Sequence, residues 1–245
     1  MGRIVVGKVV SCYLSQFCYN ACIMGTLFIV ATPIGNLGDI TLRALETLKS
    51  VDIILCEDTR VTKNLLVHFE ITTSTMSYHQ HSDSGTTKKI QALLAEGKNL
   101  ALVTDAGTPG ISDPGNLLIA ELLKANPTQI ISPIPGASAV IAALSISGLP
   151  TDKYIFMGFP PHKNKRLKFF QEVAESKYTV AFYESSHRIL KAMENLTTVL
   201  DTERSICVCR EITKKFETIY RGSVGGIAEM QLSEKGEFVV IVAGK

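Results

Sequence analysis

Hydrophobic and polar residues alternate in blocks along most of the chain. Short runs of aliphatic residues are followed by turns rich in Gly, Pro or Asp, and then by segments in which hydrophobic residues recur every three or four positions. The runs predict strands and the recurrence predicts amphipathic helices. In the first half the predicted strands are 27–31, 51–56, 100–104 and 129–132, and the predicted helices are 40–49, 88–96, 114–124 and 137–147. Alternating strands and helices indicate βαβ units and a mainly parallel sheet.

Two boundaries in this pattern are marked by particular residues. Asp113-Pro114 predicts a helix start, because Asp accepts a hydrogen bond at an N-cap and Pro suits the first turn. After Gly148-Leu149-Pro150 the pattern changes, and strands are predicted at 154–159, 178–183, 205–211, 217–222 and 237–242, with helices near 165–175 and 186–200. We therefore predict two α/β domains, 24–149 with a mainly parallel sheet and 150–245 with a mixed sheet.

The second domain should contain an antiparallel pair, because the connection 211–217 is too short for a helical crossover. Two unlike α/β domains leave a cleft between them, and small ligands often bind in such clefts.

Four turns should meet at one edge of the first sheet, at 32–39, 57–60, 105–110 and 133–138. Ligands of open α/β sheets bind where turns leave the carboxyl ends of the strands. Gly and Pro also suit any ordinary loop, so it is the grouping of four turns that favours a ligand site. None of the turns matches G-x-G-x-x-G or G-x-x-x-x-G-K-[ST], which argues against dinucleotide and nucleoside triphosphate binding. We expect a flat ligand that is neutral to zwitterionic.

The charge of the chain limits its possible partners. Residues 1–23 hold Arg3 and Lys8 and no acid, which leaves 25 − 2 = 23 basic residues against 23 acidic residues in the remainder. A neutral body argues against general nucleic-acid or membrane-surface binding, because such binding needs many cations. Any RNA contact should therefore come from a local patch. The composition, 46% hydrophobic and 20% charged, is that of a globular protein.

Cysteine use separates the first 23 residues from the rest. Three of the six Cys lie there, and the segment lacks the A-x-A site of a secretory signal. We expect 1–23 to be a non-native or disordered leader and the folded unit to begin at Met24. Cys56, Cys207 and Cys209 lie inside hydrophobic runs, which favours a reducing cytoplasm without disulfides. Cys207 and Cys209 share one face of a strand with no second Cys/His pair nearby, so no metal site is expected.

Seven short motifs follow one another in a fixed order over residues 24–245. They are 27–41 (LFIVATPIGNLGDIT), 57–60 (EDTR), 104–109 (TDAGTP), 135–138 (PGAS), 183–188 (YESSHR), 210–214 (REITK) and 236–241 (GEFVVI). Together they closely resemble the ribosomal RNA small subunit methyltransferase I family of the tetrapyrrole methylase superfamily.

The resemblance implies a two-domain tetrapyrrole methylase fold with S-adenosylmethionine in the cleft between the domains. It also implies a homodimer, no metal, and methylation of the ribose 2′-hydroxyl of a cytidine in the 16S RNA of the small ribosomal subunit. By position in the motifs, it implies cofactor contacts at Pro33, Asp105, Gly107, Ala137 and Ser138.

The acceptor implied by the resemblance needs a base or a polarising group, because a ribose hydroxyl is a poor nucleophile. Carboxylate candidates at the sheet edge are Glu57, Asp58, Asp105 and Glu184, and Arg60 and Arg188 could hold a phosphate. Alternatively, 57–60 and 184–188 form ion pairs or helix caps that only shape the cleft, and His187 is as well explained by packing as by catalysis.

A basic run follows Pro160-Pro161 and is the best candidate for RNA docking. It contains the cations Lys163, Lys165, Arg166 and Lys168. In a neutral body, phosphate contacts would have to concentrate in such a patch. The alternative is a solvated helix start. The chain has no aromatic RNP motif, which argues against base stacking of the RRM kind.

Two other functions fit the same motifs. One is a related small-molecule methylase acting on a corrin, a porphyrin or a modified-residue precursor, and the other is a catalytically silent binding module. The small-molecule members resemble G-x-G-P-G-D in the first turn, where this chain has Thr-Pro-Ile-Gly-Asn-Leu-Gly-Asp at 32–39. That difference, together with the motif at 57–60, favours RNA.

Overall fold

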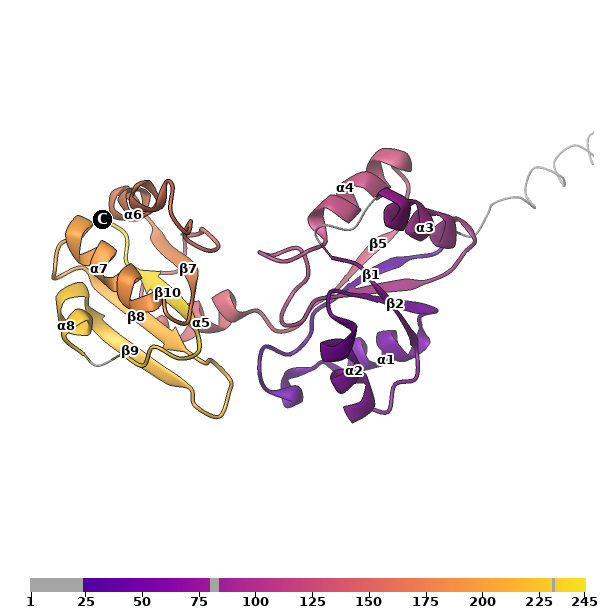
Figure 1. Cartoon of the computed structure of the whole chain (residues 1–245), viewed down its shortest axis with the longest axis horizontal. Helices are drawn as coiled ribbons and strands as arrows, with labels where there is room; N and C mark the ends of the chain where they lie inside the picture. The colour runs from indigo at the N-terminus through magenta and orange to yellow at the C-terminus, as the bar shows by residue number, and fades with distance from the viewer. Residues whose placement is uncertain (1–23, 80–83, 231) are drawn as a thin grey trace, which may run out of the picture.

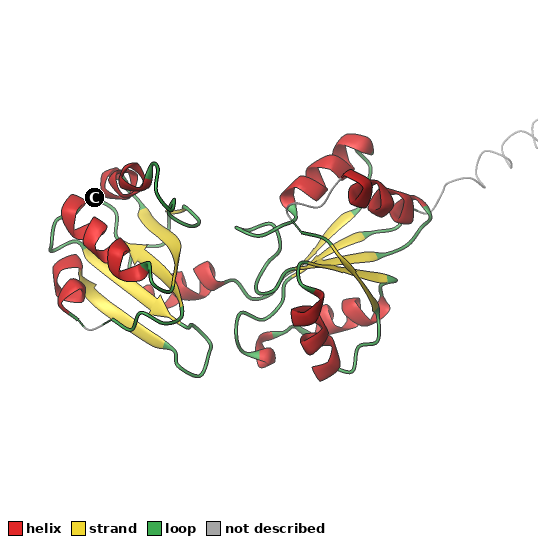
Figure 2. Ribbon diagram, viewed as in Figure 1, coloured by secondary structure: helices red, strands yellow, loops and turns green. Residues whose placement is uncertain are grey.

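The chain folds into two lobes, each built on a five-stranded sheet (Figures 1 and 2). The computed structural model describes residues 24–79, 84–230 and 232–245, so the predicted leader at 1–23 lies outside the described residues. The first sheet is wholly parallel and the second is mixed. The predicted fold class, two α/β parts with these two kinds of sheet, is confirmed.

The first sheet has the strand order β3-β2-β4-β1-β5. Its strands are β1 (Leu27–Val30), β2 (Ile53–Cys56), β3 (Ser74–Ser77), β4 (Leu100–Val103) and β5 (Ile131–Ile134). Its helices are η1 (Leu37–Asp39), α1 (Leu42–Ser50), α2 (Thr59–His68), α3 (Ser84–Ala95) and α4 (Asn116–Ala125). Helices α1 and α2 cover one face, and α3 and α4 cover the other (Figure 1). Strands β2 and β4 lie inside the sheet and are largely buried on both faces, which explains their continuous hydrophobic runs.

The second sheet has the order β6-β7-β10-β8-β9, and β6 and β7 are its parallel pair. Its strands are β6 (Tyr154–Phe156), β7 (Thr179–Ser185), β8 (Ser205–Arg210), β9 (Thr218–Ser223) and β10 (Glu237–Val242). Helices α6 (Arg166–Glu175), α7 (Ile189–Val199) and α8 (Val224–Glu229) pack on one face around Phe170 and Phe182. Strands β8 and β9 are antiparallel, as the short connection between them predicted.

The other face of the second sheet is covered by helix α5 (Ala139–Ser147). Sequence analysis placed this helix at the end of the first domain, yet Val140 and Leu144 pack against Cys207, Cys209 and neighbouring residues of the second sheet. The small and aliphatic residues of α5 are needed there for close packing. The chain therefore passes from one sheet to the other at the turn 135–138, before α5 begins (Figure 1).

The sequence analysis missed strand β3 and helix α2 and placed the start of helix α4 too early, and each of these errors has a local cause. Strand β3 was missed because it is a polar edge strand, STMS, paired only with β2. Helix α2 was missed because its first residues were interpreted only as a turn. Helix α4 begins at Asn116 after Gly115, whose φ of 141° suits Gly, and not at Asp113-Pro114. Asp113 is therefore not the cap of this helix. None of the described helices has the length and hydrophobicity needed to cross a membrane.

Candidate active site

Three of the four predicted turns are joined by hydrogen bonds at the carboxyl edge of the first sheet. The backbone N–H of Thr32 donates to the Gly107 carbonyl at 2.9 Å, and the N–H of Gly107 donates back at 3.1 Å. The Thr108 hydroxyl donates to the carbonyl of Ala137 at 3.1 Å. Gly107 has φ 84°, a left-handed conformation that only Gly adopts freely. The grouping of these turns, predicted from topology, is thus the observed arrangement.

The fourth turn joins the group through Asp58, whose N–H lies 3.3 Å from Asp105 Oδ1. Asp58 Oδ1 accepts from the N–H of Arg60 at 2.8 Å and caps α2, and Asp58 Oδ2 pairs with the Arg60 guanidinium at 2.6 Å. Hydrogen bonding by Arg60 lowers the pKa of Asp58 to about 2. Asp58 therefore acts here as a helix cap and ion-pair partner, whereas the Arg60 side chain is 89% exposed.

A cavity of about 230 Å³ lies between the two lobes, and we call it the interlobe cavity. Its wall includes Gly107 and Ser138 of the predicted cofactor set, with Phe159 and Tyr183 facing them from the second lobe. The rings of Phe159 and Tyr183 meet edge to face, with centroids 5.4 Å apart. The backbone of Ala137 accepts the bond from Thr108, and its side chain packs beside the core under α5.

The other two predicted cofactor residues, Pro33 and Asp105, line a neighbouring cavity of about 410 Å³. This second cavity lies between the first turn and α2, and we call it the α2 cavity. The two cavities share wall residues Ile34, Ala106, Lys214 and Glu237. The predicted cofactor set is therefore divided between two adjoining spaces.

Asp113 is a carboxyl group of the interlobe cavity that sequence analysis had interpreted as a helix cap. Burial, and then the negative charges of Glu57 and Asp105, raise its pKa to about 6. The pKa of Glu57 is also raised, first by burial and then by Asp105. An acid with a pKa near neutrality in a cavity is suited to exchanging a proton. No motif pointed to Asp113, because its role depends on how the loop 108–115 folds.

Glu184 lies at the wall of the interlobe cavity with both oxygens occupied. Its Oε2 pairs with Arg166 at 3.1 Å, and its Oε1 pairs with Arg188 at 3.2 Å and accepts the N–H of Ser185 at 2.9 Å. Arg188 also donates to the carbonyl of Pro160. This geometry fits the alternative interpretation of the motif 183–188, an ion-pair network that shapes the cleft.

The ion pairs of Glu184 remove Arg166 from the predicted basic patch. Arg166 is 7% exposed and also donates to Asn195 Oδ1 at 3.1 Å, so the prediction that it belongs to an exposed RNA-binding patch is wrong. Lys163, Lys165 and Lys168 are exposed. His187 is exposed, has φ 63° and lies outside the walls of both cavities.

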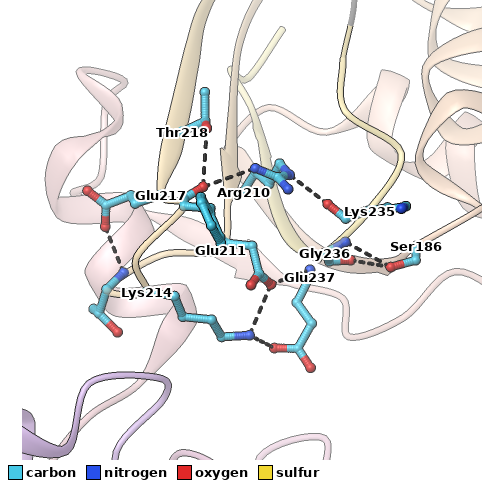
Figure 3. A network of polar contacts seen from close by, with 11 residues as sticks. Ser186, Arg210, Glu211, Lys214, Glu217, Thr218, Lys235, Gly236 and Glu237 are labelled. Carbon is cyan, nitrogen blue, oxygen red and sulfur yellow. Dashed lines mark hydrogen bonds and ion pairs between the residues drawn. The ribbon is translucent and has the colours of Figure 1, made fainter.

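Lys214 stands in the wall that separates the two cavities, and sequence analysis did not single it out from its motif. Its Nζ lies 3.0 Å from Glu211 Oε1 and 2.8 Å from Glu237 Oε2 (Figure 3). Burial opposes the ammonium charge, but the bonds from Glu237 and Glu211 outweigh it and raise the pKa of Lys214. The stem of Lys214 occupies the space beside Gly35 that a side chain there would fill. Lys214 thus connects the second lobe to the first turn.

Comparison with known proteins identifies the group to which this architecture belongs. Residues 26–228 match the family model described as Tetrapyrrole (Corrin/Porphyrin) Methylases. Ribosomal RNA small subunit methyltransferase I of Synechocystis sp. is 51% identical over 90% of this chain and 80% of its own length. The protein of that name from Halalkalibacterium halodurans is 45% identical over 90% of this chain and 76% of its own length. The crystal structure of the methyltransferase CobJ superposes with a TM-score of 0.66 at 17% identity, covering 90% of this chain and 94% of that one.

Proposed function

Because the chain belongs to the ribosomal RNA small subunit methyltransferase I family, within the tetrapyrrole methylases, we propose that it methylates the RNA of the small ribosomal subunit. The methyl donor in this proposal is S-adenosylmethionine, and the acceptor is the ribose 2′-hydroxyl of a cytidine in 16S RNA. The observation that carries the proposal is the interlobe cavity, whose wall combines loops of both sheets with an acid of raised pKa.

The residues of the interlobe cavity fit S-adenosylmethionine, which carries a sulfonium and an ammonium cation, a carboxylate and an adenine. Phe159 and Tyr183 provide an aromatic wall for the adenine. Ser138 makes no side-chain cap bond to α5, so its hydroxyl is available to a ligand at the helix start. When bound there, the cofactor supplies an electrophilic methyl group.

The chain itself would contribute position, exclusion of water and a proton acceptor. The hydrogen-bonded turns hold the cavity wall in one shape, which lowers the entropic cost of aligning two reactants. We propose Asp113 as the base, because its pKa is raised to about 6 whereas Asp58 and Glu184 are committed to arginines. Deprotonated Asp113 would accept the hydroxyl proton while the methyl group passes from the donor sulfur to the ribose oxygen, which would break the bond between sulfur and methyl carbon and leave the donor as a neutral thioether.

We further propose that Lys163, Lys165 and Lys168 contact RNA phosphates, with exposed Arg60 on the first lobe as a second contact. The buried free thiols of Cys56, Cys207 and Cys209 support a reducing cytoplasm as the working compartment. A homodimer is also proposed, and the exposed Ile141 and Ile146 on α5 are candidates for its contact.

Methyl transfer to competing acceptors tests this function. Labelled S-adenosylmethionine is offered with small ribosomal subunits, free 16S RNA or a precorrin, and the label in each acceptor is measured. The proposal predicts transfer to the subunit or its RNA and none to the precorrin. Transfer to the precorrin alone would assign the chain to the small-molecule methylases, and no transfer to any acceptor would favour a silent binding module.

A further inference from the structure

The α2 cavity adjoins the interlobe cavity, and the shared wall contains Ile34, Ala106, Lys214 and Glu237. A group-transfer reaction must bring two molecules together at the bond that forms. If the interlobe cavity takes the donor, the neighbouring space is where an acceptor can reach it.

A buried hydroxyl in the wall of the α2 cavity independently indicates a ligand. Thr104 directly follows β4 and is 2% exposed, and its Oγ1 has no hydrogen-bond partner among the described residues. Neighbouring Thr32, by contrast, donates its hydroxyl to the Thr104 carbonyl at 3.1 Å. Unpaired buried polar groups are uncommon and destabilise the folded state, so the Thr104 hydroxyl is expected to serve a partner that enters the cavity.

Lys214 provides a second polar group on the wall shared with the interlobe cavity. An ammonium has three N–H donors, and the contacts with Glu211 and Glu237 use two of them (Figure 3). The carboxylates hold the ammonium in place and leave one donor for a ligand oxygen.

The α2 side of the cavity has the chemistry of a site for a nucleoside. Val61 and Leu65 offer hydrophobic surface to a flat base, and the amide of Asn64 offers both a donor and an acceptor. The exposed guanidinium of Arg60 lies one residue before this wall in the same helix and is suited to a phosphate.

We propose that the α2 cavity takes a single unstacked nucleoside of the acceptor RNA, contacted by Thr104, Asn64 and Lys214. The proposal rests on the proposed function and assigns its two substrates to different cavities. Enzymes that modify nucleotides inside structured nucleic acid commonly extrude the target from the stack. A pocket for one nucleoside beside the donor would select an extruded residue.

Filling each cavity separately tests the assignment. Leu65→Trp fills the α2 cavity, and the matched variant Ile111→Trp fills the interlobe cavity, because each residue lines only one of the two. Leu65→Trp should raise the KM for subunits at least tenfold and leave S-adenosylmethionine affinity in calorimetry within twofold. Ile111→Trp should weaken S-adenosylmethionine binding at least tenfold. Weaker cofactor binding by Leu65→Trp, with an unchanged KM for subunits, would overturn the assignment.

A second variant removes the unpaired hydroxyl and does not depend on a bulky substitution. Thr104→Val should raise the thermal midpoint, because a buried polar group without a partner is removed, and should also raise the KM for subunits. A merely structural threonine would not produce a more stable enzyme that binds its acceptor more weakly. A higher midpoint with an unchanged KM would contradict a role for Thr104.

Binding of cytidine without cofactor distinguishes failure of this proposal from failure of the proposed function. Saturation-transfer NMR on the full chain should detect cytidine with the parent and with Ile111→Trp, and should lose the signal with Leu65→Trp. A cytidine signal that survives Leu65→Trp would refute the α2 cavity as the nucleoside site. Cytidine binding in the α2 cavity without methyl transfer to any RNA would refute the proposed function alone.

Discussion

Asp113 shows at the scale of a single residue how the fold changes what a sequence pattern predicts. An Asp-Pro pair ahead of hydrophobic residues is a good helix start, but the Gly110 N–H bonds to the Pro114 carbonyl at 3.1 Å and Asn116 Nδ2 donates to the Gly110 carbonyl at 2.7 Å. These bonds close a loop ahead of α4 and place Asp113 at the interlobe cavity. Its raised pKa follows from burial beside other carboxylates, which no local pattern could reveal.

Asp113→Asn should remove the acidic limb of the pH profile. In the parent, kcat/KM for subunits should rise with pH up to about 6, where the raised pKa lies, and stay level above it. The Asn variant cannot accept a proton, so its activity should fall by about 100-fold or more without a limb near that pH. A parent profile that is level from pH 5 to 8, measured over about that range, would exclude Asp113 as the base.

Asp113→Asn should also change the free energy of unfolding, by an amount that depends on pH. The folded pKa of about 6 lies above the ordinary value of 3.8, so the folded state binds protons more tightly and loses stability as pH rises through this window. Asp113→Asn should therefore be more stable than the parent in urea unfolding at about pH 8 and similar to it at about pH 4. A destabilised variant at pH 8 would mean that the ionised Asp113 has an unrecognised partner.

At the scale of elements, a strand or helix was predicted correctly where its own residues show a clear hydrophobic pattern. Strands β1, β2 and β4 were predicted because a strand buried on both faces is a continuous hydrophobic run. Strand β3 and helix α2 could not be predicted in this way, because Ser74–Ser77 is a polar edge and Thr59–His68 begins inside a motif interpreted as a turn. Glu184 was predicted to be either a base or an ion-pair residue, and Arg166 an RNA contact, but their pairing joins residues 18 positions apart and needs the fold.

Gly107 provides a prediction about the turns that join these elements. A side chain at φ 84° should cost about 1–2 kcal/mol of stability, so Gly107→Val should unfold at a lower temperature. It should also weaken S-adenosylmethionine binding about tenfold, because it disturbs the pairing of Thr32 and Gly107 at the cavity wall. The far-ultraviolet circular dichroism spectrum should stay native.

The matched control for this prediction is Gly148→Val. Gly148 has φ 74° at the end of α5, with no neighbouring atom within 4 Å of an added Cβ, and it lines neither cavity. This variant should lose comparable stability and keep its cofactor affinity. Equal losses of affinity in the two variants would show that the effect is general destabilisation and not local to the cavity.

At the scale of the whole molecule, the two lobes are linked by the turn 135–138 and by the contact of Lys214 with Gly35, and α5 packs on the second sheet. The hydrophobic period of α5 predicted a helix but could not say which sheet it would cover, because both sheets offer hydrophobic faces. The same limit applies to the cavities, since each wall combines segments from distant parts of the sequence. The motifs predicted which turns would meet, and the division of those turns between two cavities required the structure.

RNA docking is a property of the surface and should respond to salt. Replacing Lys163, Lys165 and Lys168 together by Gln should raise the KM for subunits and reduce the slope of log affinity against log salt by up to about 2, at about 0.7 per phosphate contact. Cofactor affinity should not change. A control triple variant of Lys49, Lys88 and Lys124, exposed cations of the first lobe, should behave like the parent. Equal salt slopes for both triple variants would remove the patch from the RNA interface.

Identification of the methylated product tests the central claim most directly. Small subunits are incubated with the full chain and S-adenosylmethionine carrying a labelled methyl group, the RNA is digested to nucleosides, and the labelled nucleoside is identified by mass spectrometry. The proposed function predicts 2′-O-methylcytidine as the labelled product, and the assignment of donor and acceptor to adjoining cavities predicts that Asp113→Asn and Leu65→Trp strongly reduce the label. Label on a base, or labelled 2′-O-methylcytidine formed equally well by both variants, would contradict it.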